Sequence, residues 1–186
     1  LAAGATAVDV FTYTVTDGAL SASAELLITV TGVNDAPVAV ANTNEVPENG
    51  VIGFAAVSSV LGDAADVDGD ALTVSSIRTG NVAATDGAQG EIGSTLVGAY
   101  GVLTLNADGQ YRYTTTASAV DGLAAGATVV DVFTYTITDG ALSASAELLI
   151  TVTGVNDAPV LEDAGGTVIF SLGIPNVESG TSTGTS

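Results

Sequence analysis

The sequence contains no cysteine, histidine, methionine or tryptophan, and its only basic residues are Arg78 and Arg112. Without histidine and cysteine there can be no Ser-His-Asp triad, no thiolate nucleophile, no imidazole acid–base catalyst and no zinc site of the usual kind. The lack of cysteine also excludes stabilisation by disulfides. Any catalysis would therefore have to rest on carboxylates alone.

Positive charge is scarce, because 21 acidic residues give the chain a net charge of -19 at pH 7. This balance opposes binding to nucleic acid and to anionic lipid, since both require a basic surface. The longest apolar runs are too short to span a bilayer, so we expect no membrane insertion. Residues 1–4 lack the pattern of an export signal, and we expect any such signal to lie outside this segment. The expected charged partners are cations.

The chain contains an internal repeat, because residues 1–38 recur as residues 123–160, an offset of 122 positions. The copies differ by two substitutions, Ala7 to Val129 and Val15 to Ile137. This period exceeds the roughly 20–50 residues of solenoid repeats and is similar to the length of a whole sandwich domain, about 100 residues. The positions of the repeat boundaries predict three parts. Residues 1–35 are the last strands of a preceding repeat, residues 36–157 are one complete repeat, and residues 158–186 are the start of a following domain or a linker tail.

Alternation of β-branched or aromatic residues with polar ones predicts strands in most of the repeat. Residues 132–138 and 144–153 form a predicted hairpin around Asp139-Gly140. A second hairpin is predicted for residues 102–105 and 111–115. Further strands are expected at residues 38–41, 51–60 and 72–77, and residues 81–98 are expected to form a long loop or irregular ribbon.

These segments amount to about seven strands at the spacing of an immunoglobulin-like fold. Within the second hairpin, Tyr111 and Tyr113 should share one face and Arg112 should take the other. No segment shows helical periodicity. The predicted fold is therefore all-β, an immunoglobulin-like antiparallel β-sandwich.

Acidic residues are densest at Asp63, Asp66, Asp68 and Asp70. Carboxylates so close together repel one another, and Ca²⁺, which takes about six to eight oxygen ligands, would relieve that repulsion. The spacing of the acids and of Gly69 does not match an EF-hand loop. The alternative is that these residues are solvated turn formers that cap local amides.

The repeat junctions both read Gly-Val-Asn-Asp-Ala-Pro, at residues 32–37 and 154–159. Proline keeps the preceding residue extended, so the junction should be stiff. Strand directions predict two groups of cation ligands, one at each end of the sandwich. One group is Asn34, Asp35, Asp66, Asp68, Asp70 and Asp139; the other is Glu48, Asp131, Asn156 and Asp157.

Several motifs resemble the VCBS and cadherin-like repeats of large RTX-type bacterial surface adhesins. The resemblance lies in residues 100–105, 108–113, 131–135 and 156–159, and Pro47-Glu48-Asn49 and Asp66-Val67-Asp68 are similar to cadherin calcium motifs. It implies calcium ions that brace successive domains, type I secretion to the extracellular bacterial surface, and a role in cell adhesion or biofilm formation. The junction is shorter than the cadherin consensus, which leaves the number of ions per junction open.

Three functions follow from these features. The first is an extender that Ca²⁺ makes rigid and whose partners are the neighbouring repeats of the chain. The second is a module that binds carbohydrate or another copy of the adhesin through Tyr100, Tyr111, Tyr113 or the loop at residues 81–98, although such tyrosines more commonly belong to a core. The third is a glycosidase based on a carboxylate pair such as Glu48 and Asp66. We favour the extender and expect no enzymatic activity.

Overall fold

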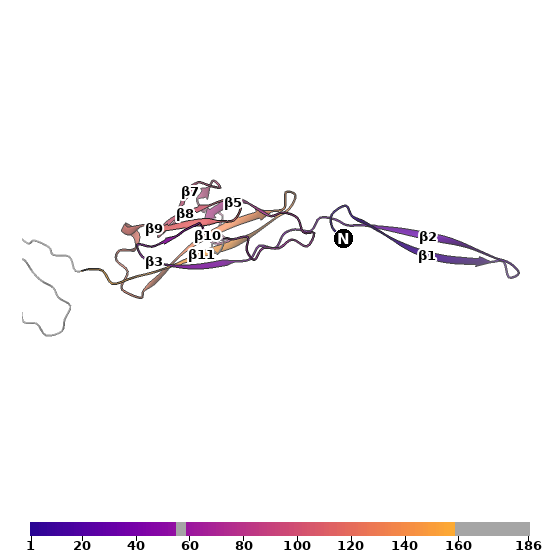
Figure 1. Cartoon of the computed structure of the whole chain (residues 1–186), viewed down its shortest axis with the longest axis horizontal. Coiled ribbons are helices and arrows are strands. Elements are labelled where there is room, and N and C mark those ends of the chain that lie inside the picture. Colours follow the sequence, from indigo (N-terminus) through magenta and orange to yellow (C-terminus); the bar gives the residue numbers. More distant parts are fainter. Residues whose placement is uncertain (55–58, 159–186) are drawn as a thin grey trace, which may run out of the picture. The chain divides into compact units, whose positions relative to one another are not determined.

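The computed structural model describes residues 1–54 and 59–158, and these residues are nearly all strand (Figure 1). The chain divides into two units, Leu1–Val155 and Asn156–Ser186, and every strand in the described residues belongs to the first. The predicted all-β class is confirmed. The expected tail or following domain at residues 159–186 lies outside the described residues.

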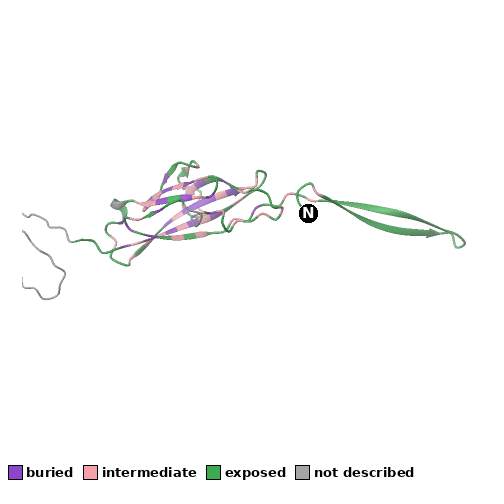
Figure 2. Cartoon of the chain, viewed as in Figure 1, coloured by how far each residue is buried: buried purple, intermediate pink, exposed green. Residues whose placement is uncertain are grey.

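The first element is a hairpin in which β1 (Thr6–Thr16) pairs antiparallel with β2 (Ser21–Thr31). Asp17 closes its turn, because its Oδ1 accepts hydrogen bonds from the amides of Ala19 at 2.9 Å and Leu20 at 2.8 Å. All residues of both strands are exposed (Figure 2). The hairpin forms a separate two-stranded sheet.

The remaining strands form a sandwich of two sheets. The larger has five strands in the order β3-β11-β10-β5-β6. Their bounds are β3 Asn42–Pro47, β11 Ser143–Thr153, β10 Thr128–Thr138, β5 Thr73–Thr79 and β6 Gln89–Gly90. The second sheet has four strands in the order β4-β9-β8-β7. Their bounds are β4 Val51–Ile52, β9 Tyr111–Thr115, β8 Gly101–Leu105 and β7 Thr95–Val97.

Period-two alternation in β10 and β11 builds one wall of the core. Phe133, Tyr135 and Ile137 on β10 and Leu148 and Ile150 on β11 have no exposed surface. The residues between them point to the other face of the sheet, because successive side chains of a strand alternate between its faces, and Thr134 is buried there as well. The expected hairpin around Asp139 is confirmed, and both strands begin earlier than predicted, at Thr128 and Ser143, and end where predicted.

The opposite sheet supplies the other wall. Tyr111 and Tyr113 on β9 are buried while Arg112 between them is exposed, as their alternation predicts. Tyr113 packs edge-on against Phe133, with ring centroids 6.3 Å apart and an interplanar angle of 71°. The expected hairpin of residues 102–105 and 111–115 is confirmed as β8 and β9.

The first strands differ from the prediction. The strand expected at residues 38–41 begins instead at Asn42, and Val38 forms only an isolated bridge to Ala65. The reason is that β3 pairs in parallel with β11 from Asn42 to Pro47, and the preceding residues are used to reach that edge. The strand expected at residues 51–60 is limited to β4 and a bridge at Ser59, with residues 55–58 outside the described part.

Two further differences concern short elements. The expected loop at residues 81–98 contains β6 and β7, which add edge strands to the two sheets. A single helical turn, α1 (Ala117–Val120), crosses from β9 toward β10. Short strands and single turns fall below the length at which sequence periodicity can be read. Within the described residues, no helix is long and apolar enough to cross a membrane.

Candidate metal centre

The loop before β5 gathers the carboxylates of Asp66, Asp68 and Asp70, hereafter the Asp66 cluster. Oδ1 of Asp66 accepts hydrogen bonds from the amide of Asp68 at 2.8 Å and that of Asp70 at 3.4 Å. Gly69, with φ of +82°, allows the chain to turn between them. One carboxylate oxygen from each acid lies within 4.8 Å of the others. Asp63, the first acid of the run, is not a member of this group.

The junction before β3 runs directly beside this loop. Val38 and Ala65 exchange two backbone hydrogen bonds, of 2.8 and 3.2 Å. The amide of Asp35 donates to Oδ2 of Asp68 at 2.7 Å. The junction is therefore held against the Asp66 cluster by main-chain and side-chain contacts.

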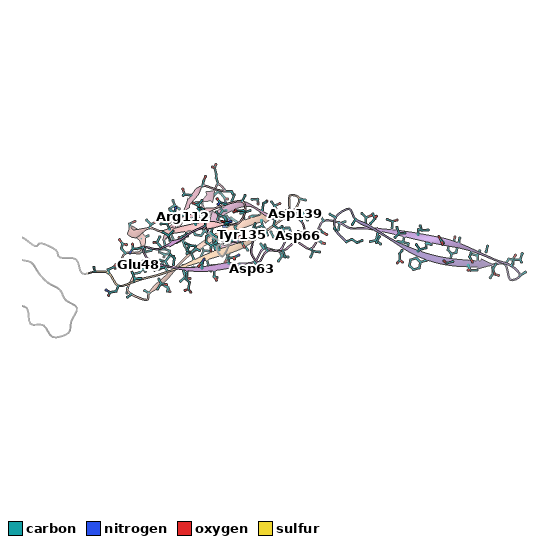
Figure 3. All side chains as sticks on the ribbon, in the orientation of Figure 1. Glu48, Asp63, Asp66, Arg112, Tyr135 and Asp139 are labelled. Carbon is teal, nitrogen blue, oxygen red and sulfur yellow. The ribbon has the colours of Figure 1, made fainter. Side chains whose placement is uncertain are left out.

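Asp139, in the turn between β10 and β11, joins the same end of the sandwich (Figure 3). Its Oδ1 accepts the amides of Ala141 at 2.6 Å and Leu142 at 2.7 Å, and its Oδ2 accepts the side-chain amide of Asn34 at 2.8 Å. Hydrogen bonds from Leu142, Ala141 and Asn34 lower the pKa of Asp139. The structure thus brings together residues 34 and 35, the Asp66 cluster and Asp139, as the sequence predicts for this end, and their role as ligands stays a prediction.

Two carboxylate oxygens of the cluster, Oδ2 of Asp66 and Oδ1 of Asp68, are buried without a hydrogen-bond partner. A buried, unpaired carboxylate oxygen is costly because it has lost its water and gained no donor. A hard cation would satisfy both oxygens, and Ca²⁺ accepts such carboxylates in irregular loops. The donor set therefore fits Ca²⁺.

Glu48 lies at the opposite end of the sandwich from Asp66 and Asp139 (Figure 3). It is 2% exposed, its Oε1 accepts the amide of Val155 at 2.6 Å, and its Oε2 has no partner. Glu48 also donates its own amide to Thr153 O at 2.8 Å. This buried carboxylate, directly after β3, is a second position at which a cation would relieve an unpaired charge.

Asn156 and Asp157 follow Val155 in the chain and belong to the second unit. The side-chain amide of Asn156 donates to the carbonyl oxygen of Asp157 at 3.1 Å. Asn34 makes the equivalent contact with Asp35 at 3.0 Å, so both junctions contain this local hydrogen bond. A ligand role for Asn156 and Asp157 stays a prediction.

Asp131 has a different environment from the other predicted ligands. It is 3% exposed and lies on the core face of β10, in phase with Phe133. Its carboxylate accepts the amides of Ala99 at 3.0 Å and Tyr100 at 3.1 Å and the hydroxyl of Tyr113 at 2.9 Å. These donors give the buried carboxylate a structural role, and a ligand role for Asp131 stays a prediction.

The turn between β7 and β8 that receives Asp131 was not expected from the sequence. A Cβ on Gly98 would collide with the carboxylate of Asp131, and one on Gly101 would collide with the ring of Tyr113. Burial and the neighbouring Asp131 carboxylate raise the pKa of Tyr113, so its hydroxyl remains a donor. The signal that could have found this contact is the position of Asp131 in the alternation, which puts its side chain among core residues.

The alternatives to a cation site find less support in the geometry. Tyr111 and Tyr113 are 3% and 0% exposed, so they belong to the core and offer no stacking face to a sugar. Glu48 and Asp66 lie at opposite ends of the sandwich, which does not suit a pair of glycosidase carboxylates about 5–10 Å apart (Figure 3).

Comparison with known proteins gives solved structures that are distantly similar. The endo-fucoidan hydrolase MfFcnA4 from glycoside hydrolase family 107 is 23% identical to this chain, with a TM-score of 0.35. The aligned region covers 82% of this chain and 19% of the hydrolase chain. The endo-fucoidan hydrolase MfFcnA9 of the same family gives 20% identity, a TM-score of 0.28, and coverage of 77% and 22%. This similarity is too low to carry a functional argument.

The search of curated proteins gave no match. The family model of the bacterial cadherin-like domain, by contrast, matches residues 34–154. This range begins at the Asn34 junction, contains the Asp66 cluster and all nine strands that the described residues place in the sandwich, and ends just after β11. The chain belongs to the bacterial cadherin-like domain family.

Proposed function

We propose that this chain is an extender segment of a bacterial surface adhesin, in which Ca²⁺ at the ends of each sandwich stiffens the junction to the next repeat. It would serve cell adhesion or biofilm formation at the extracellular surface, after type I secretion. Membership of the bacterial cadherin-like family and the near-identical repeats support a mechanical module.

The observation that carries the proposal is the pair of buried, unpartnered oxygens on Asp66 and Asp68. In the Asp66 cluster, one oxygen from each of three carboxylates lies within 4.8 Å of the other two, which is costly without a counter-charge. With two basic residues in the whole chain, a protein cation cannot supply that counter-charge at every acidic site. A divalent ion can.

An ion at this position would act on the junction through contacts that are already present. The amide of Asp35 donates to Asp68, and the side chain of Asn34 donates to Asp139. Fixing the carboxylates of Asp68 and Asp139 therefore fixes the junction residues that contact them. In the absence of the ion, repulsion among like charges would loosen the same contacts.

Glu48 extends the proposal to the other end of the sandwich. Its contact with the amide of Val155 places a buried carboxylate beside the residue that precedes Asn156 and Asp157. Glu48 would be the ligand that the sandwich contributes at this end, and a ligand role for Asn156 and Asp157 stays a prediction. In a tandem array each junction would then receive ligands from both flanking domains.

The proposal gives the chain no catalytic role, and its partners are the neighbouring repeats. It rests on oxygen ligands that extracellular modules commonly use with dissociation constants of about 10⁻⁴ to 10⁻³ M. External calcium is high enough to fill sites of that affinity.

The test is a titration of the whole chain with Ca²⁺ and, separately, with Mg²⁺, followed by thermal unfolding. Ca²⁺ at about ten times its dissociation constant should stabilise the sandwich by about 1.4 kcal/mol per site. Mg²⁺ should have a smaller effect, because it demands a stricter octahedral geometry and retains its waters. Small-angle scattering of the same samples should show larger dimensions with Ca²⁺ as the junctions stiffen.

The matched variants are Asp66→Asn with Asp68→Asn and, as a control, Asp86→Asn with Asp121→Asn. Both pairs remove the same charge, and Asp86 and Asp121 are exposed residues away from the cluster. The first pair should abolish the main Ca²⁺ response and the second should preserve it. An equal response in both pairs, or none to millimolar Ca²⁺ in the unmodified chain, would refute the proposal.

Glu48→Gln tests the second site, because its effect on the unfolding temperature should have opposite signs without and with Ca²⁺. Without Ca²⁺ the substitution removes a buried, partly unpaired charge and should raise the unfolding temperature. With Ca²⁺ it removes a ligand and should lower the unfolding temperature relative to the unmodified chain. A Glu48 that serves only the fold would shift both conditions in the same direction.

A further inference from the structure

The hairpin β1–β2 exposes apolar residues that match the buried core residues of β10–β11. It matches β10–β11 at an offset of 122 residues, and the strand registers agree, since Phe11 faces Leu26 as Phe133 faces Leu148. Phe11 is 48% exposed and Phe133 is 0% exposed. The same side chains thus form a core in one place and an open apolar face in the other.

The open face and both edges of the hairpin lack the contacts that β10–β11 receives. In the sandwich, β10 pairs with β5, β11 pairs with β3, and the sheet of β8 and β9 covers the apolar face. Within the described residues, β1 and β2 pair only with each other. A contiguous apolar face flanked by unpaired strand edges marks an interaction site.

We propose that β1–β2 is the docking surface for a second copy of residues 36–122, joined to the chain directly ahead of Leu1. The copy would add a parallel strand beside β2, an antiparallel strand beside β1, and a second sheet over Phe11 and Tyr13. The occupant follows from the structure itself, because an identical surface on β10–β11 is covered by residues 36–122 of this chain.

The turn that enters the hairpin indicates covalent attachment. Gly4 donates its amide to Gly32 O at 3.0 Å, as Gly126 donates to Gly154 O at 2.9 Å. In the sandwich this turn follows α1 and leads the chain from it into β10, with the amide of Leu123 donating to Val120 O at 2.9 Å. The residues before β1 therefore have the conformation of the segment that connects α1 to β10 in the sandwich. The complete sandwich of another molecule cannot cover β1–β2 in this way, because its own β10–β11 already occupies that position.

Docking predicts two specific contacts for residues that are exposed in the hairpin. Asp9, the counterpart of Asp131, should accept the copied amides of Ala99 and Tyr100 and the copied hydroxyl of Tyr113. Tyr13, the counterpart of Tyr135, should donate to the copied carbonyl of Val40. Both side chains would then change from solvated to buried.

The test is an extended protein in which residues 36–122 are fused directly to the N-terminus of the whole chain. The new junction reads Asp-Gly-Leu, as at residues 121–123, so no foreign sequence is introduced. Amide hydrogen exchange is measured with a chelator present, which separates the result from the proposed Ca²⁺ role. Exchange in β1–β2 should slow by at least about a hundredfold and approach that of β10–β11.

Phe11→Asp with Tyr13→Asp in the extended protein is the control, and it should return β1–β2 to fast exchange while β10–β11 stays protected. The proposal fails if β1–β2 exchanges equally fast with and without the added copy. It also fails if β1–β2 is already protected in the original chain in a manner that increases with concentration, since hairpins of two molecules would then cover each other.

Discussion

The hairpin β1–β2 and the hairpin β10–β11 have nearly one sequence and opposite environments. Tyr13 is 52% exposed and Tyr135 is buried, although the two occupy the same position in matching eleven-residue strands. The local structure is the same in both, because strand bounds, turn and register all repeat at an offset of 122. Alternation and turn chemistry therefore specify the hairpin, and the surrounding strands specify its burial.

The comparison also separates two levels of stability. A two-stranded hairpin alone is marginal in water, because it buries little apolar surface against the entropy of ordering its backbone. β10–β11 belongs to a sandwich whose core is shared by two sheets. The same substitution at matching positions of the two hairpins therefore separates the stability that arises within the hairpin from the stability that arises from packing against other strands.

The largest difference is expected for the aromatic residues of the core face. Phe133→Ala should lower the free energy of unfolding by about 3–5 kcal/mol, because it removes a fully buried ring that packs on Tyr113. Phe11→Ala should change it by less than about 0.5 kcal/mol. Urea unfolding of the two variants measures both values. Equal effects would show that β1–β2 is part of the cooperative unit.

The next difference concerns the aspartate that occurs once in each hairpin. Asp131→Ala should cost about 3 kcal/mol, because it leaves the amides of Ala99 and Tyr100 and the buried Tyr113 hydroxyl without their acceptor. Asp9→Ala should be nearly neutral in the same unfolding experiment. If Asp131 served only as a cation ligand, its substitution would be neutral without Ca²⁺ and costly with it.

A smaller difference is expected at the glycines that end the hairpins. A Cβ on Gly154 would collide with Ala124 O, and one on Gly32 with Ala2 O. Gly154→Ala should destabilise the sandwich by about 2 kcal/mol through this overpacking. Gly32→Ala should open only the turn at residues 1–5 and leave the unfolding transition of the sandwich unchanged, which amide exchange of the two turns would show.

The smallest difference is electrostatic. Asp17 and Asp139 both have a lowered pKa from hydrogen bonds of the next turn residues, and Asp139 has an additional bond from Asn34. The pKa of Asp139, measured by NMR titration, should lie below that of Asp17, and Asn34→Ala should bring the two together. Because its folded pKa is depressed, Asp139 stabilises the sandwich above its unfolded pKa, and this contribution is lost as the pH falls through the folded pKa. Coincident titrations in the unmodified chain would contradict the Asn34 contact.

Much of the candidate site could be predicted because its residues are close in sequence or lie at turns. The Asp66 cluster falls within five residues, and strand direction places it beside the junction and Asp139. The hydrogen bonds of Asp131 could not be predicted, because they depend on Tyr113 and on a turn about thirty residues away. The late start of β3 was also missed, since its pairing in parallel with β11 joins residues about a hundred positions apart.

The sequence by itself determined the all-β class, the two hairpins, the repeat and the acidic loop, because alternation, turn residues and charge density act over a few neighbouring residues. Only the tertiary structure decided which copy of the hairpin is a core, which carboxylates are buried without partners, and that Asp131 is already satisfied. The physical reason is that burial and hydrogen-bond partners depend on strands brought together from distant parts of the chain.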